Sequence, residues 1–359
     1  MSVLIQRRCY NCRVNQGSDC LRCHYCIHKC TCVKCPLCRQ LVTYSAVCQK
    51  CRRCNAHHTG YIFKSTNDFP HRNCEYIPEQ ATKFLLNPLP RALGVEIELS
   101  NWHNFHPSSL KHAKGTVVHD GSVRPSGNEL VVGKMLGDEY LVHMGELAQS
   151  LTLNMCEVNT TCGYHVHVDA IDLTPRLLRK LYIGFALIQK QLWGTLVAKY
   201  RRTSPDVYSF CKELDPVHIP TLMAMTRSSQ VMTWLTNHLY SLDHTKYTPE
   251  EYRYKLNYHK GHKYENQARR QALNFHSWMM RGTVEFRLKE GTVAPADLIM
   301  WPLWCGWFVH KVSAMTDKQL TTWIGKPPTL VELAKGWAVG PSPCPQDLVA
   351  WVEAKCKQV

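Results

Sequence analysis

The chain has 359 residues, of which 45% are hydrophobic, and its formal net charge is +15. This hydrophobic content suffices for a core and excludes a disordered polyion, and the length allows one large and one smaller domain. Residues 1–90 hold 13 Lys and Arg against 4 Asp and Glu, a balance of +9 that leaves +6 for the rest of the chain. The basic N-terminal quarter predicts a polyanionic partner, with a solvated basic surface as the alternative.

The sequence carries no signal for export or membrane insertion. The stretch MSVLIQRRCYNC lacks an apolar core of signal-peptide length. The longest apolar run, LIMWPLWCGWFV (298–309), is too short to cross a bilayer and contains a proline. We therefore predict a soluble cytoplasmic protein without a membrane partner, and a buried helix over residues 298–309.

The N-terminal region is rich in cysteine, with 13 of the 19 cysteines before residue 75. In a reducing compartment this density indicates metal ligands rather than disulfides. Two thiolates in a Cys-x-x-Cys step can bind one zinc ion, and residues 9–54 contain seven such steps. We predict a zinc module over residues 1–75, with His24, His28, His57 and His58 as further donors. Its predicted Zn²⁺ ligands are Cys9, Cys12, Cys20, Cys23, Cys26, Cys30, Cys32, Cys35, Cys38, Cys48, Cys51 and Cys54.

An iron–sulfur cluster is the alternative to zinc, because Cys20, Cys23, Cys26 and Cys30 follow the ferredoxin-type spacing C-x2-C-x2-C-x3-C. Thr31 stands where that motif has a proline, which favours zinc. Zinc modules commonly present a basic surface to nucleic acid or a flat surface to a protein, and the segments CRRC and LIQRR favour nucleic acid. The third possibility is a metal-binding module that stabilises the fold and binds no partner.

A change of composition marks the domain boundary. The segment YIPEQATKFLLNPLPR contains three prolines and precedes the first strong strand pattern. We therefore predict a linker over residues 76–90 and a catalytic domain over residues 91–359, with its motifs in 91–295 and a helical part in 296–359.

The stretch LGVEIELS (93–100) alternates apolar and acidic residues, which predicts a strand with Glu96 and Glu98 on one face. The two carboxylates would lie roughly 6.6 Å apart at about 3.3 Å of rise per residue. At an effective dielectric constant near 20 they would repel by about 2.5 kcal/mol. Such a pair needs a compensating positive charge.

Two later segments repeat this design. TCGYHVHVDA (161–170) alternates His165 and His167 with valines, and GTVEFRLKEGT (282–292) alternates Glu285 and Arg287 with apolar residues. In HDGSVRPSGNELVV (119–132), a DG turn leads to a strand that is predicted to start near Glu129.

Helices are predicted between and after these strands. Thr174 is a plausible N-cap with Pro175 as the first helical residue, and the apolar stripe of the following segment predicts a core-facing helix. Residues 247–272, rich in Tyr, Lys and Arg, predict another helix. Strands with an open chemical face, interleaved with long helices, predict an α+β domain with an antiparallel sheet. The stripe residues expected to be buried are Leu178, Leu181, Phe185, Ile188 and Leu192.

The acidic and imidazole side chains of these strands form a candidate metal site. Oxygen ligands with one imidazole suit Mg²⁺ or Mn²⁺ better than structural zinc, and such ions beside an arginine commonly handle phosphates. The candidate Mg²⁺ or Mn²⁺ ligands are Glu96, Glu98, Glu129, His165 and Glu285, with Arg287 beside them.

The ordered motifs GVEIEL, DGS, NELV, CGYHVHVD, YSFCKEL, ALNF and GTVEFRLKEGT resemble those of the amidoligase family of glutamine-synthetase-like carboxylate–amine ligases. The resemblance spans roughly residues 91–295. It implies a glutamine-synthetase-like fold and an ATP-dependent ligase, in which a carboxylate is phosphorylated and an amine then displaces phosphate to form an amide. It also implies that the five candidate ligands hold Mg²⁺ or Mn²⁺ between the nucleotide phosphates.

The resemblance further implies roles for individual residues. Arg287 would stabilise the transferred phosphoryl group. His167 would face substrate or ATP, and Asp120 would hold an ion or the incoming amine. The weaker motif positions Asn159, Arg270 and Asn274 are candidates for cofactor binding.

Two other functions are weighed against the ligase. HVHVD is similar to the His-x-His-x-Asp motif of metal-dependent hydrolases, but Ala170 stands where one such motif has a further histidine. A non-catalytic nucleic-acid-binding protein is disfavoured because all acidic motif positions are filled. Since a metabolite ligase needs no zinc module, we expect a macromolecular substrate, either nucleic acid or protein.

Overall fold

The computed structural model describes residues 90–102, 105–106, 110, 115–124, 127–135, 138–204, 209–242, 244–261, 266–339 and 343–358. The predicted zinc module, its twelve cysteine ligands and nearly all of the predicted linker lie outside the described residues.

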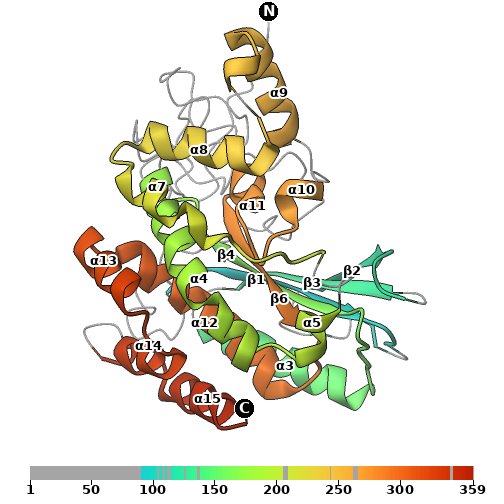
Figure 1. The fold of residues 1–359 in the computed structure, drawn as a ribbon. Helices are drawn as coiled ribbons and strands as arrows, with labels where there is room; N and C mark the ends of the chain where they lie inside the picture. Colours follow the sequence, from blue (N-terminus) through green and yellow to red (C-terminus); the bar gives the residue numbers. More distant parts are fainter. Residues whose placement is uncertain are drawn as a thin grey trace, which may run out of the picture.

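A six-stranded sheet organises the described part of the chain (Figure 1). The strand order is β2-β3-β1-β4-β6-β5, and all neighbouring strands pair antiparallel, which confirms the predicted antiparallel sheet. β2 and β5 were not predicted from the sequence. The strands are β1 Leu93–Leu99, β2 Gly115–Asp120, β3 Gly127–Met135, β4 Gly163–Asp169, β5 Leu273–Asn274 and β6 Thr283–Glu290.

The three motif strands are neighbours at the centre of the sheet. β4 lies between β1 and β6, although long stretches of chain separate the three in sequence. Arg201 joins β4 to β6, because its guanidinium donates to the carbonyl oxygens of Cys162 at 3.1 Å and of Arg287 at 3.2 Å. The predicted motif segments therefore form one continuous surface.

Helices α3 (Asp138–Leu153), α4 (Pro175–Thr195) and α12 (Pro295–Ala314) cover the apolar face of the sheet. Phe286 of β6 points into this layer, and its ring lies edge-on to Phe185 of α4 and to Trp301 and Trp304 of α12. The apolar side chains of β1 are buried in the same core, as their alternation predicts. In Figure 1, α3 and α12 lie below the sheet, whereas four later helices lie above it, namely α8 (Ser228–Tyr240), α9 (Pro249–Gly261), α10 (Asn266–Arg269) and α11 (His276–Arg281).

The predicted helix after Thr174 is confirmed, and its five stripe residues are all buried. The buried helix predicted over 298–309 is also confirmed as the centre of α12, with Pro302 inside it. The remaining segments are α5 Lys199–Thr203, η4 Pro216–His218, α7 Ile219–Ala224, α8 Ser228–Tyr240, η5 His244–Lys246, α11 His276–Arg281, α13 Asp317–Gly325, α14 Leu330–Trp337 and α15 Gln346–Cys356.

The single helix predicted over residues 247–272 is wrong. The structure instead has α9 (Pro249–Gly261) and the short α10 (Asn266–Arg269), and the chain then enters β5. α9 ends on a glycine, which is disfavoured inside a helix. The Tyr, Lys and Arg pattern did not reveal this break.

The chemical face of the sheet is not open to solvent, contrary to the prediction. Glu96, Glu98, Glu285 and Arg287 are all buried, with exposed fractions of 3–8%. α11 packs against β6, and the charged side chains contact one another. Burial in a polar cluster strengthens every electrostatic interaction within it, because little water is present to screen the charges.

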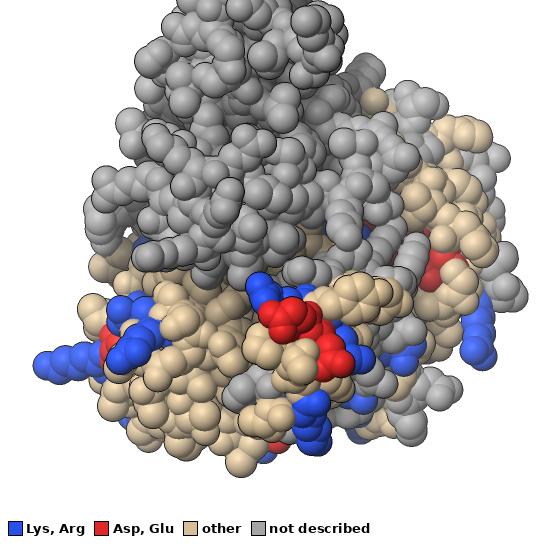
Figure 2. Space-filling view, turned by 90° about the horizontal axis from the view of Figure 1, so that it is seen from above, with Lys and Arg blue, Asp and Glu red and all other residues tan. Residues whose placement is uncertain are grey.

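The described surface shows no single basic field in the view of Figure 2, where basic side chains lie in separate groups with acidic side chains beside some of them. Within the described residues, no helix has the length and apolar character required to span a membrane.

Candidate metal centre

The strand register places the chemical side chains in one row across β3, β1, β4 and β6. Residues that face one another in an antiparallel pair have Cβ atoms about 4.5–5.5 Å apart. The facing pairs are Glu98 with Glu129, Glu96 with His165, and His167 with Glu285.

This row contains three overlapping groups of possible metal ligands, and within each group the ligand atoms lie within 4.8 Å of one another. Neighbouring groups share a carboxylate, so the row offers adjoining positions rather than isolated ones. The groups are Glu96, His167 and Glu285; Glu96, Glu129 and His165; and Glu98, Asp120 and Glu129.

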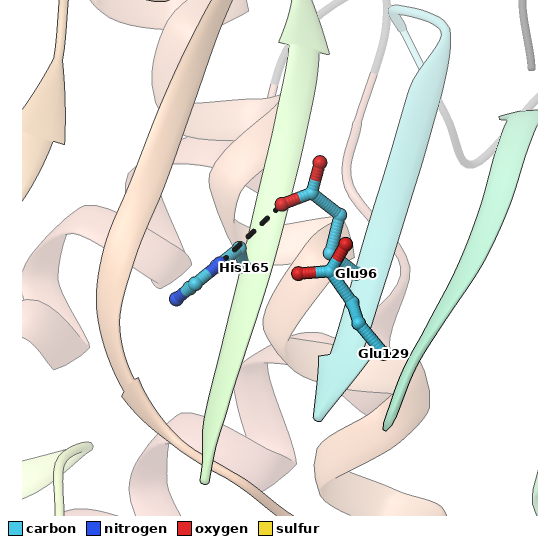
Figure 3. A group of neighbouring side chains, drawn as sticks. All are labelled: Glu96, Glu129 and His165. Atoms are coloured by element: carbon cyan, nitrogen blue, oxygen red, sulfur yellow. Dashed lines mark hydrogen bonds and ion pairs between the residues drawn. The ribbon is translucent and has the colours of Figure 1, made fainter. Parts of the chain in front are cut away.

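The middle group, shown in Figure 3, joins three strands. His165 Nδ1 lies 3.4 Å from Glu96 Oε2, and its Nε2 lies 3.7 Å from Glu98 Oε1. The imidazole therefore stands between two carboxylates that would otherwise repel. A donor set of carboxylate oxygens with one or two imidazoles fits Mg²⁺ or Mn²⁺ and contains no thiolate that would favour zinc.

Gly163 at the start of β4 allows Glu98 to be buried. Its backbone N–H donates to Glu98 Oε2 at 2.6 Å. A Cβ atom at this position would lie 2.8 Å from His165 Nε2 and 3.2 Å from the Arg201 guanidinium. A side chain at this position of the CGYHVHVD motif would therefore crowd His165 and Arg201, which favours glycine there.

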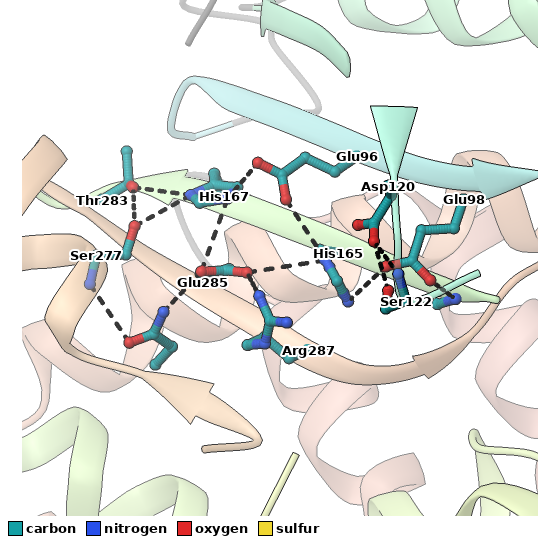
Figure 4. Close-up of polar contacts among 12 residues, drawn as sticks. Glu96, Glu98, Asp120, Ser122, His165, His167, Ser277, Thr283, Glu285 and Arg287 are labelled. Carbon is teal, nitrogen blue, oxygen red and sulfur yellow. Dashed lines mark hydrogen bonds and ion pairs between the residues drawn. The ribbon is translucent and has the colours of Figure 1, made fainter. Parts of the chain in front are cut away.

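Glu285 is the most heavily supported carboxylate of the row (Figure 4). It forms an ion pair with Arg287, and Asn274 Nδ2 donates to its Oε2 at 2.7 Å. Burial would raise the pKa of Glu285, but Arg287 and His167 outweigh it and lower the pKa to about 2. This end of the row is therefore ionised and compensated by the protein's own cations.

The two ends of the row differ electrostatically. Burial would raise the pKa of Glu96, but His167, His165 and Arg281 together hold it well below its ordinary value. The pKa of Glu129 is raised well above its ordinary value, first by burial and then by the nearby carboxylates, including Glu96. Arg287 lowers the pKa of Glu129 but does not offset these effects, so a cation bound at this end would stabilise the ionised carboxylate.

Asp120 stands at this less compensated end. It is the last residue of β2, and its Oδ1 accepts hydrogen bonds from the backbone N–H of Ser122 at 2.7 Å and from its hydroxyl at 2.6 Å. These bonds fix the carboxylate beside Glu98 and Glu129.

The three candidate cofactor-binding residues are placed differently from one another. Asn274 contacts Glu285 directly. Asn159 organises the loop before β4, where it donates to the Arg124 carbonyl oxygen and accepts from Thr161. The Arg270 guanidinium lies over the Phe210 ring, 4.5 Å from its centroid.

Sequence reasoning missed four residues of the site. Arg281 lies 3.8 Å from Glu96 Oε1 at the end of α11. Burial and the nearby charge of Arg287 lower the pKa of Arg269, and the nearby Glu285 opposes this change only in part. The hydroxyls of Ser277 and Thr283 contact His167 Nδ1 at 3.2 Å and 3.0 Å. These residues approach the ligand row only through packing between segments that are distant in sequence. Thr283 alone could have been found from the sequence, because it begins the TVEFR strand.

Residues 108–309 match the model of a protein family described as "Putative amidoligase enzyme". The match covers more than half of the chain, and the chain belongs to this family. Membership indicates an enzyme of the ligase class. The match begins after β1, so the GVEIEL strand lies outside it, although the register joins that strand to the matched region. No curated protein matches the chain.

Replacing Gly163 tests the packing of the row. In Gly163→Ala, the added methyl group must displace His165 or Arg201, and we expect the apparent Mn²⁺ affinity to fall by about 10-fold or more, as for other substitutions that disturb ligand orientation. The affinity is measured from the Mn²⁺ dependence of the melting temperature. Gly145→Ala in α3 is the control, because a Cβ there meets no atom within 4 Å. Equal Mn²⁺ affinities for the two variants would contradict this account.

Replacing Glu129 tests the uncompensated end. Because burial and the nearby carboxylates oppose the ionisation of Glu129, Glu129→Gln should leave the metal-free melting temperature unchanged or slightly raised. The increase in melting temperature caused by Mg²⁺ should shrink, because one ligand oxygen has lost its charge. Asp347→Asn, an exposed change in α15, is the charge-matched control. A wild-type Mg²⁺ response in Glu129→Gln would show that this end does not bind the ion.

Proposed function

We propose that the protein is an ATP-dependent carboxylate–amine ligase that forms an amide bond through an acyl phosphate. The observation that carries this proposal is the row of overlapping ligand groups that ends at the Glu285–Arg287 ion pair. Such a row suits several cations and a polyphosphate side by side, whereas a single structural metal would need only one group.

The predicted Glu and His ligands would hold Mg²⁺ or Mn²⁺, which when bound would neutralise the negative charge of the ATP phosphates. The protein supplies positive charge at the other end of the row. Arg287 is buried beside Glu285, and the nearby carboxylates keep it charged although burial opposes this. Arg281, beside Glu96, has a partly exposed side chain. We assign these two guanidinium groups to the transferred phosphoryl oxygens, where fixed positive charge lowers the barrier most.

The reaction has two steps. A carboxylate oxygen of the first substrate attacks the γ-phosphorus of ATP, an O–P bond forms, and ADP leaves with the electrons of the broken bond. The nitrogen of the amine then attacks the acyl carbon, phosphate leaves, and the nitrogen loses a proton. Asp120, half-buried at the end of the row opposite Arg287, is our candidate to hold the amine and accept this proton.

We further propose that the substrate is a macromolecule, nucleic acid or protein, recruited by the N-terminal cysteine-rich zinc module in the cytoplasm. Support comes from the sequence, because residues 1–90 carry +9 of the net charge of +15.

The ligase proposal is better supported than a metal-dependent hydrolase. In the HVHVD segment, Asp169 Oδ1 accepts a hydrogen bond from the backbone N–H of Ile171 at 3.2 Å, and the ligand groups do not include Asp169. The Asp169 carboxylate thus stabilises the turn after β4, whereas the glutamates of the other strands belong to the ligand groups.

ADP formation tests the proposal. The full chain is incubated with ATP, Mg²⁺, fractionated cell extract as the source of carboxylate, and hydroxylamine as a general amine. We expect ADP and a hydroxamate in equal amounts, because hydroxylamine traps acyl phosphates. Glu285→Ala should reduce both to background, and Arg287→Lys should lower kcat by about 10²–10³-fold, because it keeps the charge but loses the fork of donors.

Glu250→Ala, an exposed change in α9, is the control and should retain wild-type rates. Wild-type ADP formation by Glu285→Ala would contradict the assignment of the site. Product formation without ATP would favour a hydrolase or transferase instead.

A further inference from the structure

Two hydroxyl groups contact His167, the second histidine of the HVH motif, on the side of its ring that faces away from the carboxylates (Figure 4). The His167 side chain is fully buried, and its Nδ1 lies 3.0 Å from Thr283 Oγ1 and 3.2 Å from Ser277 Oγ. The two hydroxyl oxygens are 2.9 Å apart and therefore hydrogen-bonded to each other. Across the ring, Nε2 lies 3.2 Å from Glu96 Oε1 and 3.8 Å from Glu285 Oε2.

The hydroxyl pair belongs to the same frame as Glu285. Thr283 is the first residue of β6, two positions before Glu285, and Ser277 lies in the first turn of α11. Asn274 links the two elements, because its Oδ1 accepts from the backbone N–H of Ser277 at 3.4 Å while its Nδ2 donates to Glu285. Both hydroxyls are buried, with exposed fractions of 3% for Ser277 and 1% for Thr283. Their positions are therefore set by backbone packing.

We propose that Ser277 and Thr283 are positioning residues that orient the His167 ring so that its Nε2 joins Glu96 and Glu285 in holding a divalent cation. When Nδ1–H donates to the hydroxyl pair, the Nε2 lone pair faces the two carboxylates. The inference rests on the proposed metal–phosphate function and adds a support that the sequence motifs do not contain.

The chemical nature of the support suits this site. A metal-binding histidine usually donates its second N–H to a carboxylate, a carbonyl or water, which fixes the ring and the tautomer. A carboxylate behind His167 would add another negative charge to a face that already buries Glu96, Glu98 and Glu285. A neutral hydroxyl pair orients the ring without that cost.

Mn²⁺ binding to the full chain, without nucleotide, tests the inference. The dissociation constant is measured by electron paramagnetic resonance of free Mn²⁺. We expect Thr283→Val, which keeps the side-chain shape and removes the hydroxyl, to weaken binding by about 10-fold or more, in the range found for other groups behind metal ligands. Thr283→Ser restores the hydroxyl and should bind within about twofold of the wild type. Ser277→Ala should weaken binding less, because its oxygen is the more distant of the two from Nδ1.

Two controls separate positioning from general loss of stability. Thr236→Val removes another buried hydroxyl, in α8, which donates a hydrogen bond to the Met232 carbonyl oxygen at 2.9 Å, and this change should not alter the Mn²⁺ affinity. In a His167→Ala background, Thr283→Val should have no further effect, because its partner is already absent.

The outcomes are distinguishable. Unchanged Mn²⁺ affinity in Thr283→Val would overturn the positioning role alone, and so would an equal loss in Thr283→Ser or a further loss in the His167→Ala background. Absence of saturable Mn²⁺ binding in the wild type would overturn the cation site of the proposed function, and the positioning role with it.

Discussion

The direct opposition of Glu98 and Glu129 across β1 and β3 is the constraint on which the site depends. Like charges that face one another across strands are destabilising, and burial makes their repulsion worse. The fold offers partial compensation, because the Gly163 N–H binds Glu98 and His165 stands between Glu98 and Glu96. Arg287 also favours the ionised form of Glu129, but burial and the nearby carboxylates outweigh it and raise the pKa of this residue. The proposed divalent cation would supply the positive charge that this pair of carboxylates needs.

The opposite end of the row is built differently, and this asymmetry gives the proposed reaction a direction. Arg287 and Arg281 bring fixed positive charge to Glu285 and Glu96. In the proposed reaction the transferred phosphoryl group lies near this positive charge, and the amine lies near the Asp120 carboxylate at the other end. The proposed zinc module would then supply the substrate and not the chemistry.

The three motif strands β1, β4 and β6 could be predicted because each alternates apolar residues with charged or imidazole residues. Their adjacency followed from treating them as one sheet. The support could not be predicted, because Arg281 and Ser277 reach the row only through the packing of α11 against β6. The short β5 has only two residues and gives no periodic signal. The burial of the acidic face was also not predicted, because alternation of apolar and charged residues suggests that the charged face is exposed to solvent. Only the tertiary structure shows what packs against that face.

The most direct test of the central claim is a crystal structure of the full chain with Mn²⁺ and a non-hydrolysable ATP analogue, with the manganese atoms located by anomalous scattering. We predict manganese peaks among the Glu96, Glu98, Glu129, His165 and Glu285 side chains, with the terminal phosphate of the analogue against Arg287. Manganese absent from this row, or a nucleotide bound elsewhere on the described domain, would contradict the account.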